Sequence, residues 1–89
     1  MYPEIKRIAR ELGVEVKESI RPKYKLDVYK DGVYITSIGA RGYSDYQTYR
    51  RTHGDDFADR RREAYYNRHR KDIEKGGRGL WSWLILWNI

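Results

Sequence analysis

The residues best suited to chemistry are basic side chains in the segment DRRREAYYNRHRK, residues 59–71, where six of thirteen residues are Arg or Lys. Such side chains neutralise phosphate groups, and a nearby tyrosine such as Tyr66 can stack on a base. An alternative is a solvated helix face stabilised by internal pairs such as Asp59 with Arg62. The candidate nucleic-acid-binding residues are Arg60, Arg61, Arg62, Arg68 and Arg70.

Other reactive residue types are scarce. His53 and His69 are the only histidines, and the chain has no cysteine. A zinc site needs three or four converging ligands, and the spacing of these residues offers no closed set. The sequence also lacks a nucleophile elbow, a phosphate-cradling glycine loop and a paired-carboxylate site. It therefore predicts no catalytic residue, no metal site and no cofactor.

The second distinctive segment is GLWSWLILWNI, residues 79–89, which holds all three tryptophans and no charged residue. As a helix, it would carry on one face Leu80, Trp83, Leu84 and Trp87. As a strand, it would carry on one face Trp81, Trp83, Ile85, Trp87 and Ile89. Both arrangements are apolar on more than one side, which is typical of a segment buried on several faces. The segment could complete the protein's own core or dock on a partner, and the predicted partner-binding residues are Trp81, Trp83, Leu84 and Trp87.

Length and composition set the frame for these segments. Eighty-nine residues correspond to one small domain, residues 1–89, and the net charge of +6 favours acidic partners such as nucleic acid, anionic lipid or an acidic protein. The N-terminal residues MYPEIKRIAR carry charge where a signal peptide has its apolar region. The longest apolar run is far shorter than the ~20 residues that span a bilayer. We therefore expect neither secretion by a signal peptide nor a membrane span.

Residues 3–12 are expected to form a helix, because Pro3 suits the first helical position and Gly13 suits a left-handed stop. Its IARELGV end is similar to the first helix and turn of helix-turn-helix proteins. However, Pro22 and the β-rich run behind it leave too little room for the second helix that would enter a DNA groove.

The clearest β-structure is predicted in KYKLDVYKDGVYITSI, residues 23–38, where Asp31-Gly32 fits a two-residue type I′ turn. That turn predicts the pairs Lys30 with Val33, Tyr29 with Tyr34, and Val28 with Ile35. The residues expected on the core face are Leu26, Val28, Val33 and Ile35.

The remaining elements are helical. Ser44 and Gln47 resemble a capping box and predict a short helix, and Asp55 or Asp56 can cap a long basic helix that ends at GGRG, residues 76–79. The predicted fold class is α+β, with an N-terminal helix, a β-hairpin or three-stranded antiparallel sheet, the long basic helix and a short aromatic C-terminal helix.

Three motifs taken together resemble a family of small basic proteins of large nucleocytoplasmic DNA viruses. They are GARGYSDY at residues 39–46, the Y-x-x-R-H of Tyr65, Arg68 and His69, and the closing WSWLILWN. The resemblance covers residues 24–88, and the N-terminal helix, residues 1–13, lies outside it. One departure is RRTHGDD, residues 50–56, where family members carry a short link that contains Asp-Pro.

The family has no assigned activity, so the resemblance implies a setting rather than a reaction. It implies a small structural or accessory protein in the virion or the infected host cell, with Arg68 and His69 holding the tryptophan segment against the long helix. The leading expectation is a non-enzymatic, virion- or minor-capsid-associated protein that binds other viral proteins or itself. The alternative is a protein that binds nucleic acid weakly through its Arg-rich helix.

Overall fold

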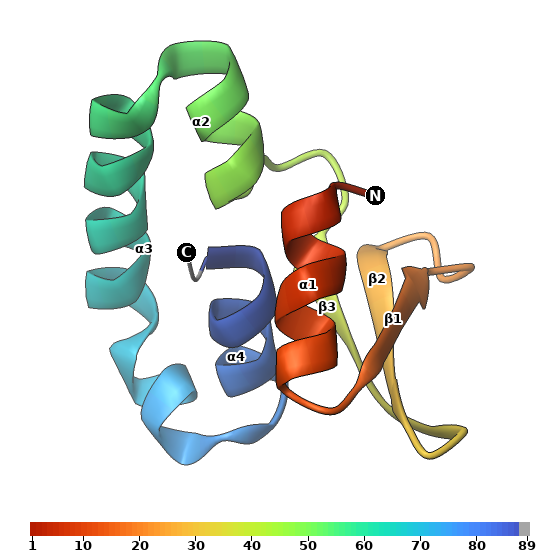
Figure 1. Ribbon diagram of the computed structural model, residues 1–89. Coiled ribbons are helices and arrows are strands. Elements are labelled where there is room, and N and C mark those ends of the chain that lie inside the picture. The colour runs from red at the N-terminus through yellow and green to blue at the C-terminus, as the bar shows by residue number, and fades with distance from the viewer. Residues whose placement is uncertain (88–89) are drawn as a thin grey trace. The chain divides into compact units, whose positions relative to one another are not determined.

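The computed structural model describes residues 1–87 and has an α+β secondary structure, which confirms the predicted fold class (Figure 1). Its elements follow the order α1, β1, β2, β3, α2, α3, α4 and η1. The chain divides into two compact units, Met1–Tyr43 and a second that begins at Ser44, and each unit is described by itself. The single domain over residues 1–89 stays a prediction.

The first unit begins with the expected helix, α1, Pro3–Glu11. Pro3 occupies the start of the helix, and the chain turns away at Gly13, whose φ is +74°. That φ lies in the left-handed region, which glycine adopts without steric cost. The residues of α1 buried on its apolar face are Ile5, Ile8 and Ala9.

The sheet is antiparallel with strand order β1-β2-β3. Its strands are β1, Glu15–Glu18, β2, Tyr24–Lys30, and β3, Val33–Ala40. The residues of β2 and β3 that are buried on one face of the sheet are Leu26, Val28, Thr36 and Ile38. In Figure 1, α1 runs alongside the sheet, and the two supply most of the buried apolar side chains of this unit.

The hairpin turn is confirmed, because φ is +51° at Asp31 and +79° at Gly32, as a type I′ turn requires. The first two predicted pairs, Lys30 with Val33 and Tyr29 with Tyr34, also form.

The third predicted pair is wrong. A register shift between Val28 and Tyr29 places Thr36, not Ile35, opposite Val28. The extra residue on β3 reverses which alternate side chains face the core. As a result, Ile35, which has no partner in this register, is 37% exposed although it was expected inside. Val33 was also expected inside, but it pairs with the exposed Lys30 beside the turn and is 65% exposed.

The second unit consists of helices. The first of them, α2, Tyr46–His53, is capped by Asp45, whose Oδ1 accepts a hydrogen bond from the Thr48 backbone N–H at 3.0 Å. The predicted helix is therefore present, but the capping residue is Asp45 rather than Ser44. Gln47, expected to take part in the cap, is instead buried.

The long helix α3, Asp55–Lys75, is followed by α4, Gly77–Ser82, and by a single π-helical segment, η1, Trp83–Trp87. We call α4 and η1 together the tail. The tail is thus helical through Trp87, and the alternative prediction of a strand is wrong for this part of the segment. Asn88 and Ile89, which the prediction also included, lie outside the described residues. In Figure 1, α2 and the tail lie on the same side of α3.

Gly32→Val is expected to destabilise the hairpin by at least ~1–2 kcal/mol, because a β-branched side chain resists a positive φ. Urea unfolding followed by far-ultraviolet circular dichroism measures the change. Asp31→Asn is the matched control, since asparagine tolerates the left-handed region and should leave the midpoint nearly unchanged. An unchanged midpoint for Gly32→Val would contradict the turn geometry.

Candidate nucleic-acid interface

The tail is held against α3 by stacked aromatic rings. The Trp87 and Tyr65 rings are nearly parallel, at 15°, with centroids 4.3 Å apart. Tyr65 also lies 4.2 Å from the His69 ring, and its hydroxyl is 3.2 Å from the Ser82 Oγ. Tyr65 is therefore the ring of α3 around which the tail is arranged.

Trp83 is the second anchor of the tail. Its ring is tilted against Tyr66 at a centroid distance of 5.0 Å, and the Arg62 guanidinium lies 4.4 Å from its centroid. The Arg62 Nε also donates a hydrogen bond of 2.5 Å to the Trp87 carbonyl oxygen. This arginine therefore binds the tail and points inward, although it was expected on the nucleic-acid surface. Tyr66, expected to stack on bases, packs on a tryptophan instead.

The four predicted partner-binding residues differ in accessibility. Trp87 is buried, with 7% of its surface exposed. Trp81, Trp83 and Leu84 are half-buried. Because the Trp83 and Trp87 rings already contact α3, part of the apolar surface expected to bind a partner stabilises this unit instead.

The other candidate arginines lie on the outside of α3. Arg61 leans toward α2, with its guanidinium 5.2 Å from the centroid of the Tyr49 ring. Arg60, Arg68 and Arg70 are exposed and make no hydrogen bond, ion pair or ring contact with any of residues 1–87. Arg68 therefore does not hold the tail, whereas His69 supports it through Tyr65.

A helical projection sorts the charges of α3, since successive residues are about 100° apart. One arc of roughly 100° carries five exposed cations and, besides them, only Ala64 and Phe57. We call these five residues the basic face: Arg60, Arg61, Arg68, Lys71 and Lys75. Arg70 lies on the other side of the helix, at a projected angle between those of Asp59 and Glu63, and so does not belong to it.

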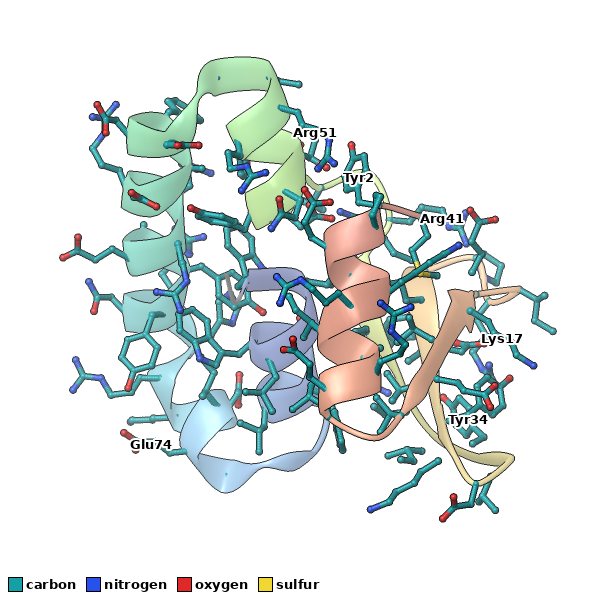
Figure 2. All side chains as sticks on the ribbon, in the orientation of Figure 1. Tyr2, Lys17, Tyr34, Arg41, Arg51 and Glu74 are labelled. Atoms are coloured by element: carbon teal, nitrogen blue, oxygen red, sulfur yellow. The ribbon has the colours of Figure 1, made fainter. Side chains whose placement is uncertain are left out.

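The acidic residues of α3 all lie outside this arc. In projection Asp72 borders it on the Arg61 side, where Arg68 and Lys75 are the cations four and three residues away. Glu74, which extends outward in Figure 2, lies beyond the opposite border. Asp59 accepts a hydrogen bond from the Tyr46 hydroxyl at 2.7 Å. Burial and this contact with Asp59 together raise the pKa of Tyr46 above its ordinary value. No carboxylate of α3 therefore lies within the basic face.

The choice of arginines from sequence missed Lys71 and Lys75. Both lie on the helical repeat of positions 61, 64, 68, 71 and 75, which alternates steps of three and four residues. Applying this repeat to the charges, as is usual for apolar residues, would have found them and would have excluded Arg62 and Arg70. Arg60 joins the same face because it lies four residues before Ala64.

The first unit contains a polar cluster that no sequence motif indicated. Asp27 on β2 is 2% exposed, and its carboxylate accepts hydrogen bonds from the Ser19 Oγ at 2.8 Å and the Ser37 Oγ at 2.6 Å. The guanidinium of Arg21 donates at 2.8 Å and lies over the Tyr34 ring, on the sheet face opposite Leu26 and Val28.

Burial acts to raise the pKa of Asp27. The hydrogen bonds from Ser37 and Ser19 and the charge of Arg21 together outweigh burial, so the pKa lies below its ordinary value. Both carboxylate oxygens are occupied by donors from the protein itself. The cluster is therefore suited to holding β2, β3 and the loop between β1 and β2 together.

Within residues 1–87, no group of three or more His, Asp and Glu side chains is placed to hold a metal ion. None of the helices in that range combines the length and the apolar character needed to cross a membrane.

Comparisons with known protein families, with curated proteins and with solved structures give no match to this chain. The fold and the surface define its class: a small basic α+β protein whose longest helix carries a cationic face on one side and an aromatic tail on the other.

Trp87→Ala is expected to destabilise the second unit by about 3–5 kcal/mol, because it removes a buried ring that contacts Tyr65. Trp81→Ala should cost less, since Trp81 is half-buried. Denaturant unfolding followed by tryptophan emission reports on this unit, which holds all three tryptophans. Equal midpoints for Trp87→Ala and the unaltered protein would show that the ring serves a partner rather than the fold.

Asp27→Asn is expected to lower the stability at pH 7 by roughly 1.5–3 kcal/mol, the usual worth of hydrogen bonds to a charged group. Because folding lowers the pKa of Asp27, the ionised group stabilises the fold above about pH 4, and this contribution is lost as the pH falls through the lowered pKa. The free energy of unfolding, measured in urea at several pH values, should therefore fall less for Asp27→Asn than for the unaltered protein as the pH is lowered from neutral through this lowered pKa. Glu15→Gln, at an exposed site on β1, is the control; identical pH profiles for Asp27→Asn and the unaltered protein would refute the role of the cluster.

Proposed function

We propose that this protein is a non-enzymatic nucleic-acid-binding protein, which contacts phosphate groups through the basic face of α3. The observation that carries the proposal is the segregation of charge on this helix. Five exposed cations share one arc that contains no carboxylate. The members of the basic face that make no hydrogen bond, ion pair or ring contact within residues 1–87 are Arg60, Arg68, Lys71 and Lys75.

The basic face brings like charges close together, although α3 also places opposite charges four residues apart, as at Arg68 and Asp72. On the basic face, Lys71 follows Arg68 by three residues, and Lys75 follows Lys71 by four. Each like-charge pair costs the isolated helix a few tenths of a kcal/mol. A bound polyanion would relieve that repulsion, so the pattern favours a phosphate-binding surface.

The protein–protein role expected from the tail has less support. Trp83 and Trp87 already stack on rings of α3, which leaves Trp81 and Leu84 as the more available part of the predicted docking surface. The viral structural or accessory role implied by the resemblance is compatible with the proposal, because a virion encloses nucleic acid.

The test is fluorescence anisotropy of a labelled 20-base-pair duplex DNA titrated with protein at several salt concentrations. We expect micromolar binding at low salt that is largely lost at physiological salt. Neutralising Arg68, Lys71 and Lys75 together to Gln should flatten the slope of log K against log salt by about 0.9 for each lost phosphate contact. Gln is suitable because its helix propensity is close to that of Lys and Arg.

The matched control neutralises three exposed cations of the first unit instead: Lys6, Arg10 and Lys30. It removes the same net charge and should leave most of the binding intact. Equal losses in the two triple variants would show that overall charge, rather than the basic face, drives binding. No binding by the unaltered protein at low salt would overturn the proposed function.

A further inference from the structure

We propose that the basic face follows one phosphate backbone of a nucleic-acid duplex and does not read bases from within a groove. This inference rests on the proposed function and specifies its ligand and its geometry. It is carried by three properties of α3: the width of the basic face, the residues at its two borders, and the absence of amide side chains and exposed aromatic rings on it.

The basic face is too narrow for a helix placed in the major groove. A helix in that position presents its front to the base edges and both of its flanks to phosphates. The cations of α3 cover only about 100° of its circumference. Arg70, the cation nearest the other flank, lies about 130° from the middle of the basic face. A single line of phosphates is therefore the anion that this surface matches.

The borders of the basic face exclude a second backbone. Asp72 lies about 20° beyond Arg61, and Asp56 and Glu74 lie about 40° beyond Arg60. All three carboxylates are exposed. In a groove they would face the phosphates of the two walls, and like charges brought together in this way oppose binding. When a single backbone lies along the middle of the basic face, these three carboxylates lie to either side of it and point away from its phosphates.

The length of the surface suits such a line of phosphates. Arg60 and Lys75 are fifteen residues apart, which corresponds to about 22 Å along the helix axis. Phosphates of one strand follow each other every ~3.4 Å along a duplex axis. The cations between these two positions can therefore reach several phosphates of the same strand.

Amide side chains, which read adenine, and exposed aromatic rings are both missing from the basic face. Its aromatic residue, Phe57, is half-buried and stacks on His53 at a centroid distance of 4.3 Å. The single amide side chain of α3, Asn67, lies outside the arc, on the side of Glu63. Stacking is worth about 1–3 kcal/mol per base to proteins that bind single strands. Because the basic face has no exposed ring for such stacking, we expect it to bind a duplex, with its denser phosphate charge, more tightly than a single strand.

The test compares two single neutralisations of equal charge, Arg68→Gln and Arg70→Gln. Both side chains are exposed on α3 and neither has a partner among residues 1–87. Arg68→Gln should weaken binding to the labelled duplex about three- to tenfold at low salt and lower the salt slope by about one unit. Arg70→Gln should change the affinity less than about twofold, because its side chain points away from the contacted strand. Circular dichroism confirms that both variants keep their helices.

A second arm varies the nucleic acid. Duplexes of unrelated sequence should bind the unaltered protein within about threefold of each other, and a single strand of equal length should bind more weakly. Equal losses for Arg68→Gln and Arg70→Gln would indicate insertion into a groove and overturn the inference. A tenfold preference for one duplex sequence, or tighter binding of the single strand, would also overturn it. In each of these cases the protein still binds nucleic acid, so the proposed function survives; it fails only if the unaltered protein binds none of these ligands.

Discussion

The stack of Trp87 on Tyr65 is the contact on which the second unit depends. The long helix α3 has 21 residues, yet only Ala58 and Ile73 are buried on it. Such a helix cannot bury enough apolar surface to pay for its own ordering, so the tail must supply it. A buried tryptophan or tyrosine contributes roughly 150–250 Å² and an upper limit of about 4–6 kcal/mol. This explains why the most apolar segment of a charged chain packs against its most charged helix.

The same contact accounts for the location of the basic face. The tail and the rings that bind it occupy one side of α3, and Arg62 is drawn into that side by the Trp87 carbonyl oxygen and the Trp83 ring. The remaining circumference is left to charged residues, with five cations on one arc and Arg70 among the acidic residues outside it. Packing and surface chemistry are therefore linked, because the residues that fix which side of the helix faces inward also fix which cations face outward.

Much of the architecture could be predicted from sequence, since it depends on local signals. Proline and glycine at its ends marked α1, and Asp31-Gly32 marked the hairpin. The errors arose where non-local contacts decide the outcome. The alternation of β3 alone could not show that Ser37 joins Asp27 on the polar face, and this arrangement accompanies the register shift that exposes Ile35. A count of arginines likewise could not show which ones the tail would cover, because that depends on contacts between distant segments.

The arrangement of the second unit also has a consequence for the order in which it can form during synthesis. A nascent chain that ends at Ser82 already contains all of α2 and α3, but the ring partners that Tyr49 and Tyr65 find in Trp87 do not yet exist. The first unit depends on no such late residue, since its turn, its strands and its buried carboxylate all lie before residue 44. Translation therefore exposes a complete α1 and sheet while α3 still lacks the rings that hold it. The second unit can therefore close only after Trp87 has been synthesised, whereas every residue of the first unit precedes it.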